Sequence, residues 1–403
     1  MNELEGGLAP PKDVNGAGVR LALVMSGGGA RAAYQVGMLR WLARRHPDLH
    51  VPVMTGVSAG AINAAFLASR PDGFGTSAEE LVDLWSHLTA EHVFRVDTLS
   101  LARNVLRVGL KLVSGGAIVT PHAHAAVDTT PLRGLLEQML DARGDEIPGI
   151  EANLRRGALS ALAITASSYT TGQSICWTQG RDIPQWERAH RKSIATRLGV
   201  RHVMASAALP MFFPAIEIEG QWFGDGGIRL TAPLSPAIHL GADRILAIST
   251  RYARTREEAD QPVVNGYPPP AQIIGVLFNA IFLDLFDADA LSMERVNMVA
   301  EVLPPDLRTG YRTIKLIVLR PSRDLGKLAN EYEAGLPGAF RFMTRGLGTR
   351  ETRSNDLLSL LMFQPDYLKR LIELGEADAE ARRDEIEGLL DGTQSGAAPA
   401  GGS

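Results

Sequence analysis

The chain has 403 residues, of which 45% are hydrophobic and 21% are charged, and its formal net charge is −4. These values are typical of a globular protein with a sizeable core, and they lack the basic excess that nucleic-acid binding requires. We therefore expect no nucleic-acid partner. Cys176 is the only cysteine in the sequence, which excludes an intramolecular disulfide and a cysteine-based metal cluster. Its strand-like surroundings predict a buried core residue.

Both ends of the sequence are predicted to lack a fixed fold. Residues 1–18 are rich in Gly, Pro and acidic residues, and residues 391–403 in Gly, Ala and Ser, so we expect a flexible N-terminal tail and a disordered C-terminal one. Residues 1–18 also lack the apolar core of a signal peptide, which favours a cytoplasmic location. The longest apolar run, residues 273–283, is shorter than the ~20 residues of a membrane-spanning helix.

The first half of the chain repeats a strand, a tight turn and a helix. Residues 19–25 form a nearly continuous apolar run, as in a strand buried on both faces, and residues 30–45 follow with a helical pattern. A second strand at 51–55 and a helix at 59–69 repeat this order. The repeat predicts right-handed crossovers and an α/β fold with a mainly parallel sheet.

Further elements follow in chain order. We predict helices at 79–94 and 131–141, a hairpin of strands at 159–167 and 173–178, strands at 244–250 and 313–319, and a long helix at 271–299. From residue 324 onward the pattern is helical and polar. The expected organisation is one α/β domain over residues 19–322 and a helical C-terminal extension over residues 323–390.

The sequence Gly-Val-Ser-Ala-Gly at residues 56–60 is a candidate nucleophile site. A serine between two glycines at a strand-to-helix junction is typical of a nucleophile elbow, because bulkier neighbours would clash in so sharp a turn. The helix that starts after Ser58 would direct free N–H groups and its positive dipole end at the same point. The elbow glycines are Gly56 and Gly60. The alternative is an ordinary turn, since the pattern also arises by chance.

A glycine-rich loop directly follows the first strand and comprises Gly27, Gly28, Gly29, Ala30 and Arg31. Such a loop brings backbone N–H groups close to a ligand, and it can hold a phosphate or an oxyanion. Its spacing also resembles a dinucleotide fingerprint, which would need an acidic residue at the end of the second strand. Asp48 precedes that strand instead, which disfavours a nucleotide-binding oxidoreductase.

The third motif is Asp225 followed by Gly226 and Gly227 at the end of an apolar strand. Glycines beside an aspartate allow it to approach another loop closely. An Asp-Gly hairpin turn is the alternative interpretation of this segment alone.

Together these three motifs resemble the patatin-like phospholipase family in type and in chain order. A segment rich in Ala and Ser at residues 204–214 and the sequence Leu-Gly-Ala-Asp-Arg-Ile at residues 240–245 extend the similarity, which covers about residues 19–250. Ala32 differs from the family pattern, because many members have the third glycine of the loop motif at this position.

The resemblance implies a three-layer α/β/α sandwich and a Ser-Asp dyad without histidine. Ser58 would be the nucleophile and Asp225 its base, and the loop from Gly27 to Arg31 would supply the oxyanion hole. The function expected is that of a lipid acyl hydrolase of the phospholipase A or lysophospholipase type, acting through an acyl-enzyme. No metal ion or organic cofactor is expected. A catalytically silent lipid-binding protein is the alternative.

Histidine is the usual base in a serine hydrolase triad of the order Ser, acid, His. His239 is the only histidine after Asp225, and its spacing indicates a residue at a helix end, so we do not expect it to be catalytic. An aspartate with an ordinary pKa of ~3.9 is a weak base for a hydroxyl proton. The dyad therefore needs a dry site, which favours a lipid ester as substrate.

Two segments suggest contact with a membrane. Arg103, Arg107 and Lys111 are spaced by four within residues 99–113, a basic amphipathic pattern that suits either an anionic membrane surface or a solvated helix face. Residues 271–286 are interpreted as core packing, with an apolar lid as the alternative. Peripheral membrane association is therefore a hypothesis.

Overall fold

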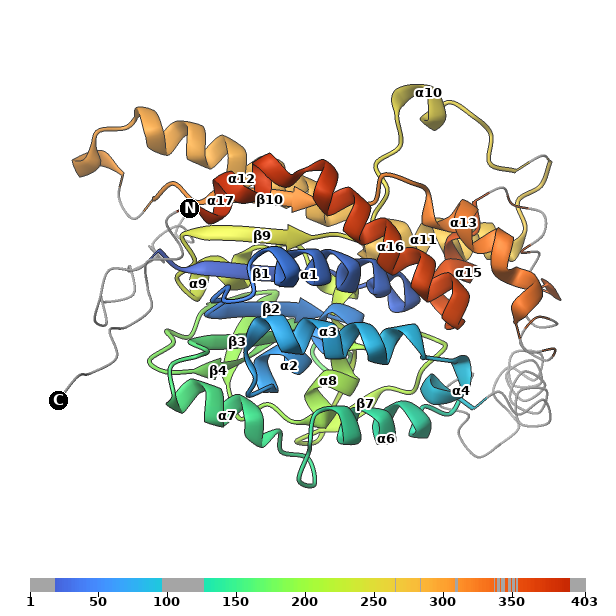
Figure 1. The fold of residues 1–403 in the computed structure, drawn as a ribbon, viewed down its shortest axis with the longest axis horizontal. Helices are drawn as coiled ribbons and strands as arrows, with labels where there is room; N and C mark the ends of the chain where they lie inside the picture. Colours follow the sequence, from blue (N-terminus) through green and yellow to red (C-terminus); the bar gives the residue numbers. More distant parts are fainter. Residues whose placement is uncertain are drawn as a thin grey trace.

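The computed structural model describes residues 19–95 and 127–391, except for residues 265, 283, 309–310, 337, 339–340, 342–344, 347–348, 350–351 and 353. Residues 99–113, with Arg103, Arg107 and Lys111, lie outside this range. The predicted tails also lie outside it, apart from Asp391. Figure 1 shows the arrangement of the described elements.

The described residues form a ten-stranded sheet in the order β10-β9-β1-β2-β3-β4-β6-β5, with β8 paired to β3 and β7 paired to β8. The strands are β1 (Leu21–Met25), β2 (Val53–Val57), β3 (Ala161–Ser168), β4 (Ser174–Gly180), β5 (Glu187–Arg188), β6 (Arg191–Ala195), β7 (Ile216–Ile218), β8 (Gln221–Asp225), β9 (Arg244–Ile248) and β10 (Lys315–Leu319). The run from β10 to β3 is parallel throughout, whereas β4 and β8 pair with β3 in the antiparallel sense. The expected α/β fold with a mainly parallel sheet is confirmed.

Helices cover both faces of this sheet. They are α1 (Ala33–Arg45), α2 (Ala59–Ser69), α3 (Gly73–Ser86), α4 (Ala90–Val93), α6 (Thr130–Met139), α7 (Pro148–Arg155), α8 (Val200–Ser206), α9 (Ser235–His239), α10 (Arg256–Ala259), α11 (Pro270–Phe282), α12 (Asp284–Val302), α13 (Leu325–Tyr332), α15 (Asp356–Leu361), α16 (Pro365–Ala381) and α17 (Arg383–Leu390). Short 3-10 turns η1 (Gly29–Ala32) and η2 (Gly226–Arg229) follow β1 and β8.

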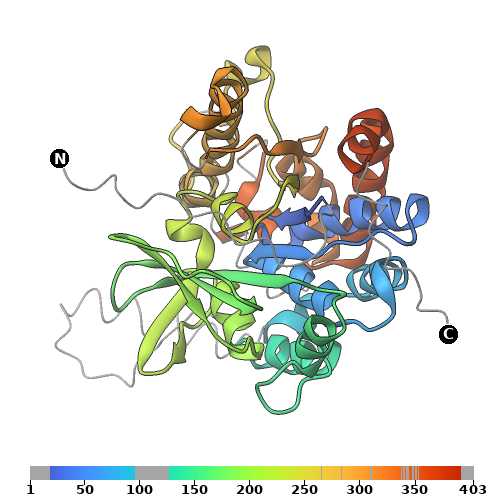
Figure 2. The same cartoon turned by 90° about the vertical axis from the view of Figure 1, so that its left-hand side faces the viewer.

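Alternating side chains of the central strands supply two hydrophobic cores. In β1, Leu21 and Leu23 face a large cluster that includes residues of α1, α2, α3 and α16, whereas Ala22 and Val24 face a smaller cluster with α9 and α12. The period of two residues in a strand places neighbours on opposite faces. The result is the three-layer α/β/α arrangement visible in two perpendicular views (Figure 1, Figure 2).

The structure corrects one predicted helix. The helix expected over residues 79–94 is two helices, α3 and α4, because Thr89 caps a new helix in a box with His92. Residue 283, within the helix expected over residues 271–299, lies outside the described residues, and helix is observed on both sides of it, in α11 and α12. Helix α7, the short strands β5, β6 and β7, and helix α8 were not predicted, since segments of two to eight residues carry little periodicity.

The C-terminal helices pack on the N-terminal half of the chain. Helix α16 runs along α1 (Figure 1), and the hydroxyl of the buried Tyr34 donates to Asp378 at 3.0 Å. Arg40 forms an ion pair with Glu376 on the same interface. A Cβ atom at Gly37 would lie 1.9 Å from the carbonyl oxygen of Ile372. The two helix backbones are therefore in close contact at this glycine.

We predict that Gly37→Ala destabilises the protein by about 1–3 kcal/mol, because a buried overpacked contact of this kind has to shift the backbone of α16. Gly134→Ala is the matched control, since a Cβ in the middle of α6 meets nothing within 4 Å and alanine favours helix by ~1 kcal/mol. Chemical denaturation of both variants measures the difference. An unchanged midpoint for Gly37→Ala would contradict the close packing of α1 and α16.

Candidate active site

Ser58 stands in a strained turn between β2 and α2. Its backbone angles are φ 55° and ψ −130°, a region that residues with a side chain rarely occupy. A Cβ at Gly56 would lie 2.4 Å from the carbonyl oxygen of Gly60, and one at Gly60 would lie 2.4 Å from that of Met25. Both positions therefore require glycine, and the turn directs the Ser58 side chain away from the sheet, as the elbow pattern predicts.

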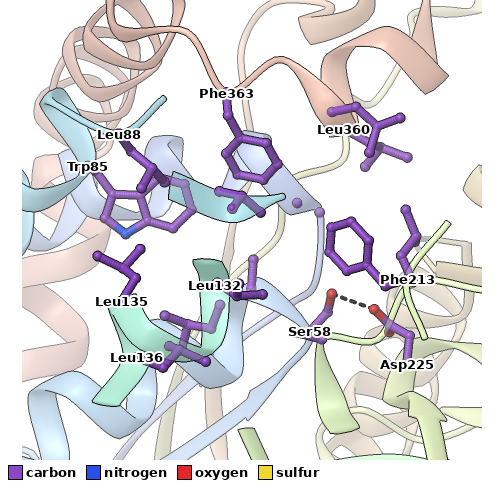
Figure 3. Close-up of a pocket in the computed structure, with 18 of the residues that line it drawn as sticks. Ser58, Trp85, Leu88, Leu132, Leu135, Leu136, Phe213, Asp225, Leu360 and Phe363 are labelled. Atoms are coloured by element: carbon purple, nitrogen blue, oxygen red, sulfur yellow. Dashed lines mark hydrogen bonds between the residues drawn. The ribbon is translucent and has the colours of Figure 1, made fainter. Parts of the chain in front are cut away.

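Asp225 lies beside Ser58 although 167 positions separate them in the sequence. The Ser58 hydroxyl donates to Oδ2 of Asp225 at 2.6 Å (Figure 3). The amide of Gly227 donates to Oδ1 at 2.9 Å. A Cβ at Gly226 would lie 2.0 Å from the carbonyl oxygen of Thr165, so this glycine lets the strand end approach β3. The predicted pair is brought together, and the carboxylate keeps a fixed orientation.

The environment of Asp225 changes its acidity. Its side chain is fully buried, and burial raises its pKa from 3.8 to about 7, against the lowering effect of the hydrogen bonds from Ser58 and Gly227. Because burial disfavours the charged form, the carboxylate is a stronger base than an exposed aspartate. The dry surroundings that the sequence argument required are therefore present.

The backbone of Ser58 has a partner that the sequence analysis missed. The Ser58 amide donates to the hydroxyl of Ser206 at 2.9 Å, and that hydroxyl donates to the carbonyl oxygen of Thr165 at 2.7 Å. Ser206 ends α8 within the small-residue segment at 204–214. The segment was recognised, but a bond to a residue 148 positions away leaves no local signal in the sequence.

The glycine loop faces Ser58 from the end of β1. Gly28 and Gly29 line the same cavity as Ser58 and Asp225, and their φ values of 150° and 53° suit glycine. A Cβ at Gly27 would lie 2.9 Å from that of Ser58. Arg31 departs from the expectation, because its amide already donates to the carbonyl oxygen of Gly28 at 3.0 Å. It is thus engaged within the loop and not directed at the cavity.

Buried polar side chains fix the base of this loop. The Gln35 amide donates to the carbonyl oxygen of Ser26 at 2.7 Å and accepts from Asn63 at 3.0 Å, and the Trp85 ring nitrogen donates to Asn63 at 2.9 Å. On the other side of the loop, the Thr250 hydroxyl donates to the carbonyl oxygen of Gly27 at 2.6 Å. Hydrogen bonds shielded from water in this way make the loop rigid.

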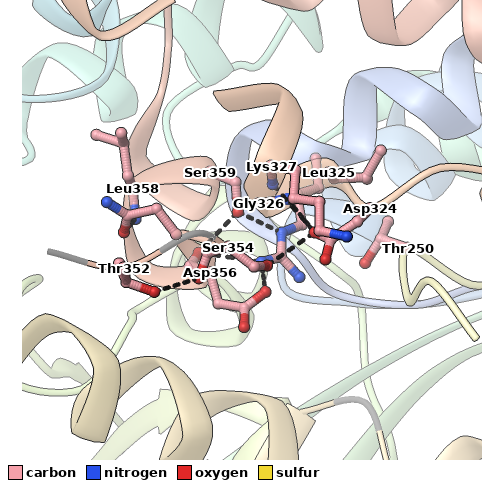
Figure 4. A network of polar contacts seen from close by, with 12 residues as sticks. Thr250, Asp324, Leu325, Gly326, Lys327, Thr352, Ser354, Asp356, Leu358 and Ser359 are labelled. Atoms are coloured by element: carbon pink, nitrogen blue, oxygen red, sulfur yellow. Dashed lines mark hydrogen bonds and ion pairs between the residues drawn. The ribbon is translucent and has the colours of Figure 1, made fainter. Parts of the chain in front are cut away.

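The Arg31 side chain connects the loop to the C-terminal part of the chain. Its guanidinium is only 3% exposed and donates to the carboxylate of Asp356 at 2.7 Å and to the hydroxyl of Ser359 at 2.7 Å. Figure 4 shows Asp356 and Ser359 on α15, beside Ser354. A Cβ at Gly29 would lie 2.2 Å from the carbonyl oxygen of Leu360. Helix α15 therefore supports the loop directly, which no motif in the sequence indicates.

An apolar cavity extends from the dyad. Its walls come from six helices and from the segments that follow α3, α8 and α15, as Figure 3 shows in part. The larger apolar lining residues are Ile62, Leu84, Trp85, Leu88, Val93, Leu132, Leu135, Leu136, Met139, Leu209, Phe213, Phe278, Leu360, Leu361 and Phe363. Such a lining excludes water and suits a hydrocarbon chain.

The other candidate residues lie apart from this cavity. His239 stacks on Trp186 with ring centroids 4.4 Å apart, and burial together with Arg191 and Arg188 lowers its pKa to about 4. Cys176 is buried in β4 as expected, and burial raises its pKa to about 12. Asp48 is exposed in the turn after α1, at the opposite end of the sheet from the glycine loop.

The sequence matches the patatin-like phospholipase family over residues 23–238, just over half of its 403 residues. The chain belongs to this family, and membership supports lipid acyl hydrolase activity. No curated protein matches the sequence.

Among solved structures, similar chains are VipD from Legionella pneumophila (13% identity, 93% of this chain and 67% of that chain, TM-score 0.34) and human GIVD cytosolic phospholipase A2 in complex with methyl gamma-linolenyl fluorophosphonate (13%, 93% and 60%, 0.42). The type III effector protein ExoU is another (13%, 94% and 61%, 0.32). The chain spans about three fifths of the length of the last two.

No helix among the described residues is long and apolar enough to cross a membrane. The described residues also contain no group of three or more His, Cys, Asp or Glu side chains placed to hold a metal ion.

We predict that hydrolysis of a soluble ester rises with pH through about 7. Asp225 must be ionised to accept a proton, so kcat/KM should fall about tenfold per pH unit below its pKa. A pH profile from 5 to 9 with a fluorogenic ester measures this. A rate that stays level down to pH 5 would contradict an aspartate base with a raised pKa.

The same pKa shift predicts an effect on stability. A carboxyl whose pKa rises on folding stabilises the protein when protonated, and this stability is lost as pH increases from 3.8 to about 7. Asp225→Asn should therefore melt at a higher temperature than wild type at pH 8, and the difference should shrink toward pH 4.

We predict that Asp356→Asn lowers kcat for a short-chain ester about tenfold with little change in KM, because Arg31 loses its charged partner and the glycine loop its support. Ser359→Ala should act in the same direction. Glu376→Gln is the matched control, since it removes another Arg–carboxylate pair between the two ends of the chain, away from the loop. Equal kcat values in Asp356→Asn and in this control would show that Arg31 and Asp356 do not position the glycine loop.

Proposed function

We propose that this protein is a serine carboxylic-ester hydrolase of phospholipase A or lysophospholipase type, which cleaves lipid esters with the Ser58–Asp225 dyad. The observation that carries the proposal is the 2.6 Å hydrogen bond from the Ser58 hydroxyl to a fully buried carboxylate. Both residues line an apolar cavity together with Gly28 and Gly29 of the glycine loop. Membership of the patatin-like phospholipase family supports the reaction class.

In the first half-reaction, Ser58 Oγ attacks the ester carbonyl carbon while its proton passes to Asp225 Oδ2. The carbonyl oxygen becomes an oxyanion, which the amides of Gly28 and Gly29 and the positive end of α2 stabilise. When the carbonyl reforms, the bond to the alcohol breaks and the leaving alcohol takes the proton from Asp225. Ser58 then carries the acyl group as an ester.

In the second half-reaction, a water molecule attacks the acyl carbon and gives its proton to Asp225. The new oxyanion occupies the same place as the first. Its collapse releases the fatty acid, and Ser58 Oγ recovers the proton from Asp225. The carboxylate thus acts alternately as base and acid, and its pKa of about 7 suits both steps.

The shape and chemistry of the cavity support a fatty acyl ester as the substrate. Its apolar walls begin beside Ser58 and reach Leu135 and Met139 on α6. An acyl chain that fills this space would displace water from the dyad and keep Asp225 in its low-dielectric surroundings.

We predict that Ser58→Ala and Asp225→Asn each lower turnover of p-nitrophenyl butyrate at least about a thousandfold while the fold is retained. His239→Ala is the control and should keep nearly full activity, because its ring stacks on Trp186 away from the dyad. Turnover and circular dichroism are measured together. Near wild-type turnover in Ser58→Ala would contradict the assignment of Ser58 as nucleophile. Loss of activity in His239→Ala would favour a conventional Ser-acid-His triad.

A further inference from the structure

Helix α11 exposes an apolar face to solvent. None of its thirteen residues, Pro270–Phe282, is charged. Ala271, Gly275 and Phe278 are buried on its inner side, whereas Ile273, Val276 and Leu277 are 43%, 54% and 53% exposed. The spacing of i, i+3 and i+4 puts these three on one side of the helix. We call this group the α11 outer face.

Helix α11 also lines the acyl cavity, through residues on its inner side. On its inner side, α11 packs against α15 and against η2, the turn that follows Asp225. Phe278 lines the cavity and contacts Phe212 with ring centroids 6.2 Å apart. The residue before Phe212 is Met211, which is 83% exposed. One helix therefore presents apolar side chains both to the cavity and to the outside.

The lack of charge distinguishes this face from other exposed apolar positions. Helix α12 also exposes apolar residues, among them Val299 at 58% and Val302 at 85%. There, however, Glu294, Arg295 and Glu301 stand among them in the sequence, as is usual for a solvated helix. Apolar side chains that are exposed together on a helix without charged residues mark a contact surface.

We propose that the α11 outer face, together with Met211, docks on the surface of a lipid aggregate through apolar contact alone. The proposal rests on the proposed function, since the cavity beside this face is taken to receive an acyl chain. An apolar helix face can insert into the boundary between head groups and acyl chains. Because α11 carries no charge, the matching surface is that of electrically neutral lipids such as phosphatidylcholine, and salt should not weaken the binding.

This docking gives the lipid a short path to the dyad. A chain leaving the aggregate beside Val276 and Leu277 would meet Phe278 on the other side of the same helix and enter the cavity there. The ester would follow toward Ser58. The lipid then need not cross bulk water, where exposure of its hydrocarbon is costly.

The test compares two double variants with equal changes in charge. Val276→Asp with Leu277→Asp alters the α11 outer face, and Val299→Asp with Val302→Asp alters exposed positions on α12 as the control. Each is made in the full chain and, for the binding measurement, also with Ser58→Ala so that the lipid is not consumed. Binding is measured by co-sedimentation with phosphatidylcholine vesicles at 0.05 and 0.5 M NaCl, and turnover with vesicles and with p-nitrophenyl acetate.

The α11 variant should lose at least tenfold in vesicle binding and vesicle hydrolysis, and its turnover of the soluble acetate should stay within twofold of wild type. The control variant should match wild type in all three, and wild-type binding should change less than twofold between the two salt concentrations. Unchanged vesicle binding in the α11 variant, an equal loss in the control, or strong weakening by salt would overturn the proposal. Vesicle binding is measured in the Ser58→Ala background. The docking proposal is therefore tested independently of whether Ser58 is the nucleophile.

Discussion

A carboxylate held in a dry cavity against a serine hydroxyl is the constraint on which the rest of this structure depends. Burial raises the pKa of Asp225 to about 7, which would make it a stronger base in the proposed reaction, and the proposal requires that water stays out and that the 2.6 Å contact with Ser58 is preserved. The strained backbone at Ser58 and the close-packed glycines around it serve this contact. A side chain at any of these glycines would separate the strands that bring Ser58 and Asp225 together.

The two ends of the described chain meet at this site. The N-terminal half supplies the elbow and the glycine loop, but the loop is supported by α15, through the bonds from Arg31 to Asp356 and Ser359. The same C-terminal segment contributes Leu360, Leu361 and Phe363 to the cavity wall. The family match ends at residue 238, so part of the site lies beyond it. The helical segment after residue 322 accordingly packs as a component of the site and of the core.

The sequence predicted the parts of the site that depend on local geometry. Ser58 and the glycines of its turn, the loop after β1 and the Asp-Gly-Gly strand end each have a steric reason that can be read within a few residues, and a mainly parallel sheet follows from the repeated strand-turn-helix order. The contributions of Ser206, Asp356 and Ser359 could not be predicted, because contacts over 148 to 328 positions depend on tertiary packing.

The most direct test of Ser58 and Asp225 as a catalytic pair is the reaction of the protein with a fluorophosphonate, followed by mass spectrometry of the labelled peptide. Such reagents phosphonylate a serine only when a neighbouring base and an oxyanion site activate it. We expect a single adduct, on Ser58, whose rate of formation drops at least a hundredfold in Asp225→Asn. A label on another serine, or an equal rate in that variant, would contradict the assignment of Ser58 and Asp225 as a catalytic pair.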